Sequence, residues 1–570
     1  MIRFHKILYA LNGKNKSNLD EICFAGFPFE YRFVSFGFIN VNHRAPEELI
    51  MNVKIISPLK KCKKEYSGAP ETFLLHKFSV VLRKLNDQYV NVNKEIFSKA
   101  RFCCQDADTR ILKRSGIEYV PEQNVFILHV NVDMPVLNGV AINQKASERA
   151  VKDILSQICD VMETVSQKEI DDCIEAYRIQ KQIRRYLSEN HYCAFVANGS
   201  VLPRENDTDK PSLKAVPFIS PKSLEISIPV DDATAITGMG IRCGITVITG
   251  GGYSGKSTLL DSLQDGIYDR LPGDGREFVI TAGDALQTFA EDGRCVSGVD
   301  LSPFFKFLPD NDVMNFTTDH ASGSVSQAAN IIEAICGGCR LLLVDEDKSA
   351  TNLMVRDKIM RQVIKKEPII PLTDLVDEFH ESYGVSTIIV IGGCSEYLFY
   401  ADCVIMMENY IAYDVTNEIS EYGLKNNIRE KTYAKVQNSR RVVPRKTDQA
   451  FLYFKKIMTE EQRKIVLDDY SVDITKLPAV KSPDQINTLM SLLMWLLCDQ
   501  NANSDEMIRK LDELLSKLFS EQGDCLSFLN VTDRRYYEYV RPIDAYCCVN
   551  RVRGLCFDRN DAINEYETVK

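Results

Sequence analysis

The sequence predicts an α/β protein with a buried parallel sheet near the middle of the chain. Short apolar runs alternate there with stretches of helical composition, which is typical of parallel strands covered by helices. A glycine-rich loop directly follows the first run and leads into a helix-forming segment. The runs are residues 244–249, 277–281, 340–344 and 386–391.

The composition of the 570-residue chain is that of a globular protein, with 45% hydrophobic and 26% charged residues. This excludes disorder over the whole chain. The formal net charge of -10 excludes indiscriminate binding of nucleic acid by the whole surface. Residues 1–200 nevertheless carry 28 basic and 23 acidic side chains, so this part has a charge of +5.

Three regions are expected from changes in composition along the chain. Residues 1–205 are predicted to form a mixed α/β, mildly basic domain, and a stretch rich in Pro, Asp and Ser at 203–222 marks its edge. Residues 206–435 are predicted to hold the sheet-containing core. Residues 436–570 are predicted to form a mostly helical C-terminal extension.

Local patterns predict individual elements in the flanking regions. Aromatic content and partial alternation predict strands at residues 31–38 and 126–132. Apolar residues at helical spacing predict helices within residues 145–190, and leucines at the same spacing predict one over residues 511–518.

The strongest functional signal is the segment Gly250–Ser257, which satisfies G-x-x-x-x-G-K-[ST] between a strand and a helix. Glycines let successive backbone N–H groups point at one anion, and the helix N-terminus adds partial positive charge. Lys256 is expected to reach the β- and γ-phosphates, and Ser257 to ligate Mg²⁺. The candidate ATP-binding residues are Gly250, Gly251, Gly252, Tyr253, Ser254, Gly255, Lys256, Ser257 and Thr258.

Two carboxylates end a later apolar run, 89 positions after the lysine of the glycine-rich loop. Asp345 is predicted to hold Mg²⁺ with Ser257, directly or through water. Glu346 is predicted to act as the general base that polarises the attacking water. Lys256 and Glu346 are therefore the candidate catalytic residues.

A third element separates subclasses of phosphate-loop proteins. The segment 321–327 opens a helix and is similar to the signature loop of ABC ATPases, which contacts the γ-phosphate held by the other subunit. Its candidate residues are Ser322, Gly323, Ser324 and Gln327. The D-loop is expected at Ser349, Ala350, Thr351 and Asn352.

Together, these motifs resemble a particular group, the predicted ATPases of the ABC class found in bacteria, plants and protists. The resemblance covers most of the chain and includes strings outside the three motifs. They are residues 194–199, 202–204, 273–277, 291–294, 384–387, 541–542 and 550–553. Where ABC transporters place the switch histidine, the chain has Gly392-Gly393, which resembles this group and implies slow turnover.

The resemblance implies an ATPase that uses ATP and Mg²⁺ and works as a head-to-tail homodimer. A kinetoplastid mitochondrial member of the group is associated with RNA, which implies RNA or another polyanion as a partner. Candidate polyanion contacts are Lys60, Lys61, Lys63, Lys64, Arg440 and Arg441. An ordinary solvated loop remains the alternative for each basic cluster.

Other functions stay open at this level. The chain could be a nucleotide-gated assembly or structural switch that binds no nucleic acid. A transporter subunit is a further alternative, although no apolar run is long enough to span a bilayer. The signature-like loop argues against a kinase or a GTPase.

The 18 cysteines in a chain without a secretory leader favour a soluble intracellular protein with free thiols. Cys336 and Cys339 have no second ligand pair, so no structural metal is expected. The first 19 residues contain four basic and no acidic residues, as in a mitochondrial presequence or an ordinary basic terminus. The expected compartment is therefore the cytoplasm or the mitochondrial matrix.

Overall fold

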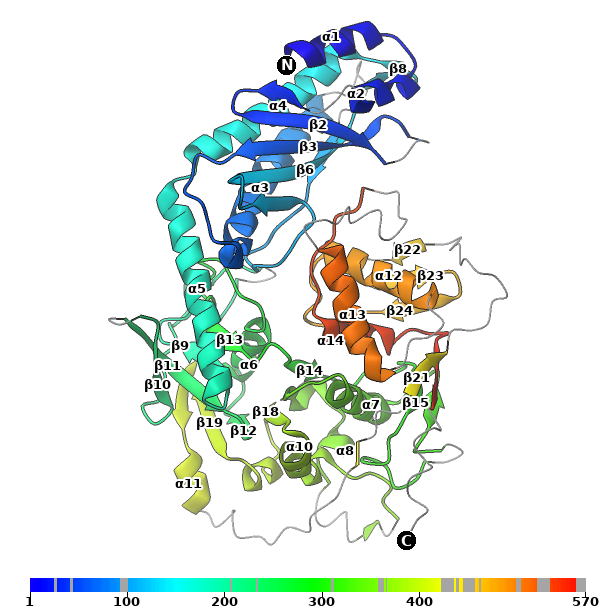
Figure 1. Cartoon of the computed structure of the whole chain (residues 1–570). Coiled ribbons are helices and arrows are strands. Elements are labelled where there is room, and N and C mark those ends of the chain that lie inside the picture. The colour runs from blue at the N-terminus through cyan, green and yellow to red at the C-terminus, as the bar shows by residue number, and fades with distance from the viewer. Residues whose placement is uncertain are drawn as a thin grey trace. The chain divides into compact units, whose positions relative to one another are not determined.

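The structure is a computed structural model, and its elements are labelled in Figure 1. The described residues are 1–24, 28–41, 45–92, 101–205, 208–231, 234–308, 312–356, 363–364, 366–421, 435–436, 440–443, 457–460, 463–498, 504–519 and 534–559. Among these residues, no helix combines the length and the apolarity needed to cross a bilayer.

The chain folds into two compact units, and both are discontinuous in sequence. The first contains Met1–Ile179, Asp269–Gly273 and Lys517–Tyr539, and the second contains the rest. The first and longest segment of the first unit therefore ends inside helix α5 (Gln167–Glu189), whereas composition places a domain edge near residue 205. A continuous helix gives no change in composition at such a boundary.

An antiparallel sheet forms the centre of the first unit, in the order β1-β2-β3-β6-β4, with β5 also paired to β6. Burial alternates along β3 and β6, so one face of the sheet is packed and the other is more open. Its strands are β1 (Phe29–Tyr31), β2 (Val34–Asn40), β3 (Glu48–Ile56), β4 (Arg101–Cys104), β5 (Ile117–Val120) and β6 (Val125–Asp133), and a separate hairpin contains β7 (Val136–Leu137) and β8 (Ala141–Ile142).

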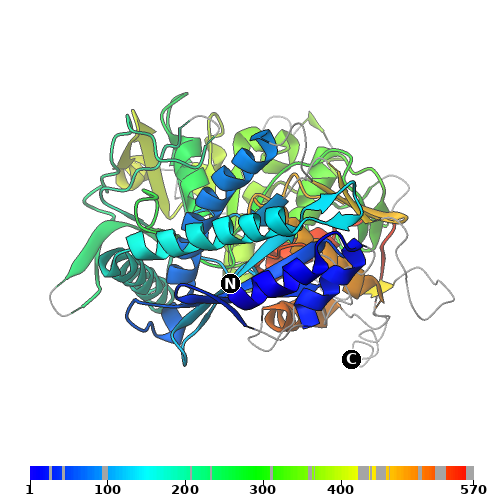
Figure 2. The ribbon, with the colours of Figure 1, turned by 90° about the horizontal axis from the view of Figure 1, so that it is seen from above.

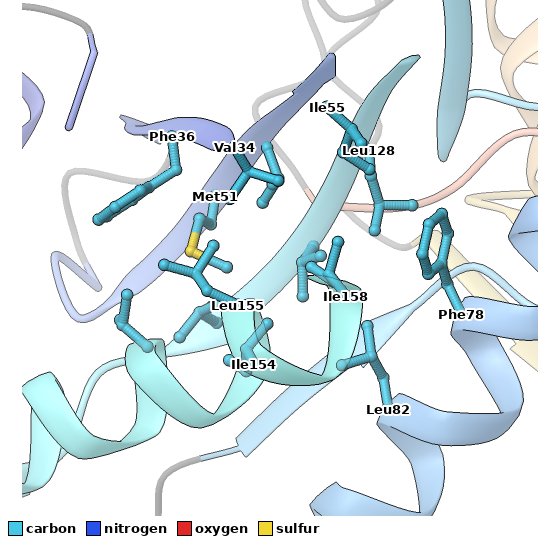
Figure 3. Close-up of a cluster of buried hydrophobic side chains, with 14 of the residues drawn as sticks. Val34, Phe36, Met51, Ile55, Phe78, Leu82, Leu128, Ile154, Leu155 and Ile158 are labelled. Carbon is cyan, nitrogen blue, oxygen red and sulfur yellow. The ribbon is translucent and has the colours of Figure 1, made fainter. Parts of the chain in front are cut away.

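Helices cover the packed face of this sheet. In Figure 3, Ile154, Leu155 and Ile158 of one helix point toward Met51 and Leu128 of the strands, because apolar residues recur at helical spacing. The blue first helix packs beside this cyan helix (Figures 1 and 2). The helices are α1 (Ile2–Leu11), α2 (Asp20–Phe24), α3 (Gly68–Val92), α4 (Gln144–Thr164) and the first part of α5.

The second unit holds the predicted parallel sheet, in the order β14-β17-β18-β12-β19-β20, in which only β20 runs antiparallel. Burial is continuous along β17 and β18, as expected for strands covered on both faces. The strands are β12 (Ile245–Thr249), β14 (Leu286–Thr288), β17 (Leu341–Asp345), β18 (Ser386–Val390), β19 (Cys403–Glu408) and β20 (Ile411–Asp414).

A second sheet of this unit is antiparallel, in the order β10-β11-β9-β13. It contains β9 (Tyr192–Ala197), β10 (Glu225–Pro229), β11 (Ala235–Arg242) and β13 (Val279–Thr281). The placement of the apolar run 277–281 in the parallel sheet is therefore wrong, since β13 pairs antiparallel with β9. A short apolar run predicts that a strand is buried, but it does not identify the strand with which it pairs.

The remaining elements of the second unit are short strands and helices. They are α6 (Lys256–Asp265), β15 (Val296–Val299), β16 (Phe316–Thr318), α7 (Gly323–Cys336), α8 (Thr351–Met354), α10 (Val376–Tyr383), α11 (Thr416–Glu421), β21 (Arg440–Val443), β22 (Ile457–Glu460), β23 (Lys464–Leu467), β24 (Tyr470–Asp473), α12 (Pro483–Cys498), α13 (Ser504–Leu518), α14 (Pro542–Val549) and β25 (Cys556–Arg559). The last residues of α13 belong to the first unit. The C-terminal region thus contains strands as well as helices.

Candidate functional site

The glycine-rich loop connects the central strand β12 to helix α6 and depends on glycine at two positions. Gly250 has φ +140° and Gly255 has φ +103°, which side-chain-bearing residues rarely adopt. A Cβ at Gly250 would lie 2.2 Å from the carbonyl oxygen of Met407, and one at Gly255 would lie 2.8 Å from the Tyr410 ring. Close packing against the β19–β20 turn therefore fixes the shape of the loop.

Lys256 folds back over this loop. Its Nζ donates hydrogen bonds to the carbonyl oxygens of Gly250, at 2.6 Å, and Gly251, at 2.8 Å. Ser257 is exposed at the start of α6, whereas Ser254 is buried and its Oγ has no hydrogen-bond partner among the described residues. The loop thus presents an ammonium group and an exposed hydroxyl at the N-terminus of a helix, where an anion is favoured.

The predicted carboxylates end a strand, β17, that is separated from the strand before the loop, β12, by one strand, β18. Asp345 of β17 pairs with Val390 of β18, and Val390 pairs on its other side with Ile248 of β12. Adjacent strands are separated by about 4.8 Å, so the ends of β12 and β17 lie about 10 Å apart. The sheet register therefore brings buried Asp345 to the same edge as the glycine-rich loop.

Lys348 lies between two carboxylates near this edge. Its Nζ is 3.7 Å from Oδ2 of Asp345 and 3.7 Å from Oδ1 of Asp261, which belongs to α6. The ammonium group offsets negative charge beside the loop. It also links the end of β17 to the helix that follows the loop.

Glu346 contacts the backbone that follows β18. Its Oε2 accepts hydrogen bonds from the amide of Gly392, at 2.5 Å, and from that of Gly393, at 3.2 Å. Its Oε1 accepts none among the described residues. The expected general base is therefore held by backbone amides at the position where ABC transporters place the switch histidine.

The signature loop and the D-loop are joined by side-chain hydrogen bonds. The Ser324 hydroxyl donates to Oδ1 of Asn352 at 2.5 Å. Gln327 donates to Ser349 Oγ at 2.8 Å and accepts from the Ala350 amide at 2.8 Å. Ser324 and Gln327 are buried, which leaves the exposed Ser322 and partly exposed Gly323 to meet a ligand.

The D-loop is tied in turn to the carboxylate strand, because Ser349 Oγ donates to the Asp345 carbonyl oxygen at 2.7 Å. Thr351 begins the short helix α8. Within the described part of the chain, no hydrogen bond joins the signature loop to the glycine-rich loop. The sequence-predicted residues thus form two groups, one around the phosphate loop and one around the signature loop.

Comparison with known protein families identifies the kind of domain in which these residues lie. The family model ABC_ATPase, a P-loop domain, matches residues 166–445, which contain the loop, both carboxylates and the signature and D-loop residues. The chain carries an ABC-class P-loop ATPase domain. An uncharacterized protein of Methanocaldococcus jannaschii is 33% identical over 262 residues, which are 44% of this chain and 58% of that protein. The match thus spans little more than half of the relative.

Two solved structures show what the ABC-class domain is similar to. One is cbiO1 of Clostridium perfringens, part of the ABC transporter complex cbiONQ, with 15% identity and a TM-score of 0.26 over 41% of this chain and 93% of that chain. The other is an ATP-binding cassette of an ABC transporter in its ADP conformation, with 14% identity and a TM-score of 0.22 over 33% and 87%. Nothing about substrate or partner follows from likenesses at this level.

A string near the C-terminus contacts distant residues of the ABC-class domain. Arg551 donates to Glu291 at 2.6 Å and to Oδ1 of Asn330 at 2.8 Å, and Arg294 contacts Asn330 and Glu333. Burial alone raises the pKa of Glu291, but Arg551 and Arg294 outweigh it and lower that pKa. The C-terminal string 550–553 therefore supports α7 and the loop after β14.

A second arginine anchors the beginning of the C-terminal helix α14. Arg541 forms a bidentate ion pair with Asp544, in which both N–O distances are 2.7 Å. It also donates to the carbonyl oxygens of Gly283, at 2.8 Å, and Ala285, at 2.9 Å. The two arginines hold the end of the chain against the core that carries the signature helix.

The candidate polyanion residues belong to different units. Lys60, Lys61, Lys63 and Lys64 are all exposed in the segment between β3 and α3 of the first unit. Lys63 lies 4.0 Å from Glu65, a distance at which the ion pair is weak. Arg440 and Arg441 lie on β21, which pairs with β25, and their side chains are outside the described residues.

Sequence reasoning missed three features of the site. Lys348 is a basic residue among acids and gives no motif of its own. The amides of Gly392 and Gly393 act through the backbone, for which the only signal is a glycine pair after a buried strand. Tyr410 packs on Gly255 from a turn that no motif marks.

Proposed function

We propose that this protein binds ATP with Mg²⁺ and hydrolyses it slowly in a head-to-tail homodimer, and that the cycle controls its grip on RNA or a similar polyanion. The observation that carries the ATPase part is the shared sheet edge. There, the glycine-rich loop with Lys256 folded over it and buried Asp345 follow strands that are separated by one strand, β18.

The residues at this edge suit the parts of a phosphoryl transfer to water. Lys256 would contact the β- and γ-phosphates, and Ser257 with Asp345 would hold Mg²⁺, which neutralises phosphate charge when bound. Glu346 would take one proton from water as the water oxygen bonds to the γ-phosphorus. The bond from that phosphorus to the leaving ADP oxygen breaks, which gives ADP and inorganic phosphate.

The dimer rests on the division of the site into two groups. Exposed Ser322 stands at the N-cap position of α7, a helix of 14 residues, and no hydrogen bond in the described chain connects it to the phosphate loop. A helix N-terminus attracts an anion, so a second copy would bring its phosphate loop to this one. Each ATP would then lie between two chains.

The Glu346→Gln variant tests this dimer. It should bind ATP with the affinity of the natural chain but lose turnover, because the amide cannot take a proton. ATP should then trap a particle of twice the 64.7 kDa chain mass, measured by light scattering after gel filtration. The control Glu418→Gln, at an exposed position of α11, should show no trapping. A monomer with bound ATP would contradict the dimer.

The RNA part rests on four exposed lysines within five positions, residues 60–64, in the more basic end of the chain. Such charges bind phosphates without reading bases, and their binding weakens with salt. The alternative function is a nucleotide-gated assembly switch without nucleic acid. The cluster of exposed lysines favours the hypothesis that the protein binds RNA.

Filter binding with single-stranded RNA at several salt concentrations separates the two. Affinity should fall with salt and should fall at least tenfold further when Lys60, Lys61, Lys63 and Lys64 become Glu. A matched control changes four other exposed lysines of the first unit, Lys84, Lys145, Lys152 and Lys168, to Glu. An equal loss in both variants would show an effect of net charge alone, and no binding at low salt would favour the assembly switch.

A further inference from the structure

The backbone after β18 holds the expected general base in a defined orientation. Two successive amides, those of Gly392 and Gly393, donate to the same oxygen of Glu346, Oε2, at 2.5 and 3.2 Å. We infer that this amide pair is the positioning element of the hydrolytic reaction, which fixes Oε2 so that Oε1 receives the proton of the attacking water. This inference rests on the proposed ATPase function.

The two carboxylate oxygens of Glu346 have different surroundings. Oε2 carries both amide hydrogen bonds, whereas Oε1 accepts none among the described residues. A carboxylate anchored through one oxygen keeps the lone pairs of the other for a proton. Orientation of this kind lowers the barrier, because the base need not be ordered during the reaction.

The amides are themselves fixed by the sheet. Ile391, next to the pair, donates its amide to the Ile248 carbonyl oxygen at 2.9 Å, so the strand before the phosphate loop holds the chain at this point. On the other side, Asp345 pairs with Val390. The amide pair is thus set in register with both the phosphate loop and the base it holds.

This role needs only the backbone amides, and the space around Gly392 and Gly393 would also admit a small side chain. A Cβ at Gly392 would lie 3.8 Å from Oε2 of Glu346, and one at Gly393 would have no neighbour within 4 Å. The contact therefore depends on the N–H groups and not on the small size of glycine. This distinguishes the amide pair from a histidine ring, which would act through its own side chain and would titrate near neutral pH.

Removal of one N–H group tests the inference. Gly392→Pro lacks the amide hydrogen, while the matched variant Gly392→Ala keeps it in nearly the same space. We expect Gly392→Pro to lower kcat for ATP at least tenfold, with the dissociation constant for ATP within threefold of the natural chain, and Gly392→Ala to lower kcat at most threefold. If Gly392→Pro does not fold, Gly393→Pro is compared with Gly393→Ala in the same way.

Combination with the base separates positioning from a structural effect. In a Glu346→Gln background, Gly392→Pro should lower the residual turnover less than twofold, because the group it positions is already gone. Multiplicative losses would overturn the inference, as would equal kcat values for the Pro and Ala variants. A weaker ATP affinity with unchanged kcat would overturn it too, since the amides would then contact the nucleotide.

The same experiment separates this inference from the proposed function. If the natural chain releases no phosphate from ATP, the ATPase proposal fails and the inference fails with it. If the natural chain hydrolyses ATP but the Pro and Ala variants behave alike, the inference alone fails.

Discussion

Cys243 lies just before the strand that leads into the phosphate loop and is an exposed residue. Its backbone amide bonds to the His191 carbonyl oxygen at 2.9 Å. Interaction with the Cys193 side chain is the largest factor that lowers the pKa of Cys243, which reaches about 6 against the opposing effect of burial. Burial instead raises the pKa of Cys403, on neighbouring β19, to about 11.

We predict that Cys243 is alkylated by iodoacetamide at least tenfold faster than Cys403 at pH 7, because the thiolate is the reacting species. The thiolate fraction rises as pH increases through the pKa, so the rate should reach half of its maximum near pH 6. Peptide mass spectrometry after timed labelling measures both rates. A Cys243 rate that still climbs between pH 8 and pH 9 would contradict the lowered pKa.

The sequence predicts individual candidate residues where a reaction needs a particular side chain at a particular spacing. The segment Gly250–Ser257 and the pair Asp345-Glu346 are of this kind, and the structure places both at one sheet edge. The amides of Gly392 and Gly393 could not be found in this way. Every residue except proline carries an N–H group, so only the folded backbone shows which ones are aimed at Glu346.

At the scale of elements, α7 is held by charges that come from the distant C-terminus. The pair of Arg551 and Glu291 is buried, with side-chain exposures of 8% and 9%. A buried ion pair adds little net stability as a pair, but loss of one partner leaves an unpaired charge in a nonpolar setting. The position of the signature helix therefore depends on the last described segment of the chain.

We predict that Arg551→Met destabilises the second unit by about 3–5 kcal/mol, the usual cost of a broken buried pair. Trp495 is the single tryptophan and lies on α12 of that unit, so its fluorescence during urea unfolding measures the change. The control Arg509→Met breaks an exposed pair with Glu513 and should cost under about 1 kcal/mol. Equal effects of the two variants would show that the buried network is not important for stability.

Elements were predictable from periodicity, but their partners were not. The run 126–132 lies within β6 and helical spacing in 145–190 corresponds to α4 and α5. Most of the expected strand 31–38 lies in β2, but its first residues belong to a hairpin turn, where Arg32 has φ +49° between β1 and β2. The position of a turn and the partner of a strand depend on contacts with other segments, which the residue pattern of one strand does not reveal.

At the scale of the molecule, the first unit is built from segments that are distant in sequence. Arg110 and Arg114 both contact Glu538, and Arg114 lies 2.9 Å from Asp108. Burial alone raises the pKa of Asp108, but the two arginines outweigh it and hold that pKa at about 2. No change in composition marks the later segments that belong to the first unit, and the two compact units could therefore not be derived from the sequence.

The first unit also takes in residues 269–273, which are separated from the end of the phosphate-loop helix α6 by three residues. The helix that starts at Lys256 is thus joined through a short stretch of chain to the unit that carries the lysines 60–64. This connection gives a covalent path between the proposed ATP site and the proposed polyanion site.

Phosphate release from ATP is the most direct test of the central claim, that this sheet edge hydrolyses ATP. The natural chain with Mg²⁺ and ATP should release phosphate in repeated turnovers. Glu346→Gln and Lys256→Ala should each lower the rate at least a hundredfold, because one lacks the proton acceptor and the other the charge beside the phosphates. Equal release by the natural chain and both variants would contradict the claim, since the activity would then arise elsewhere.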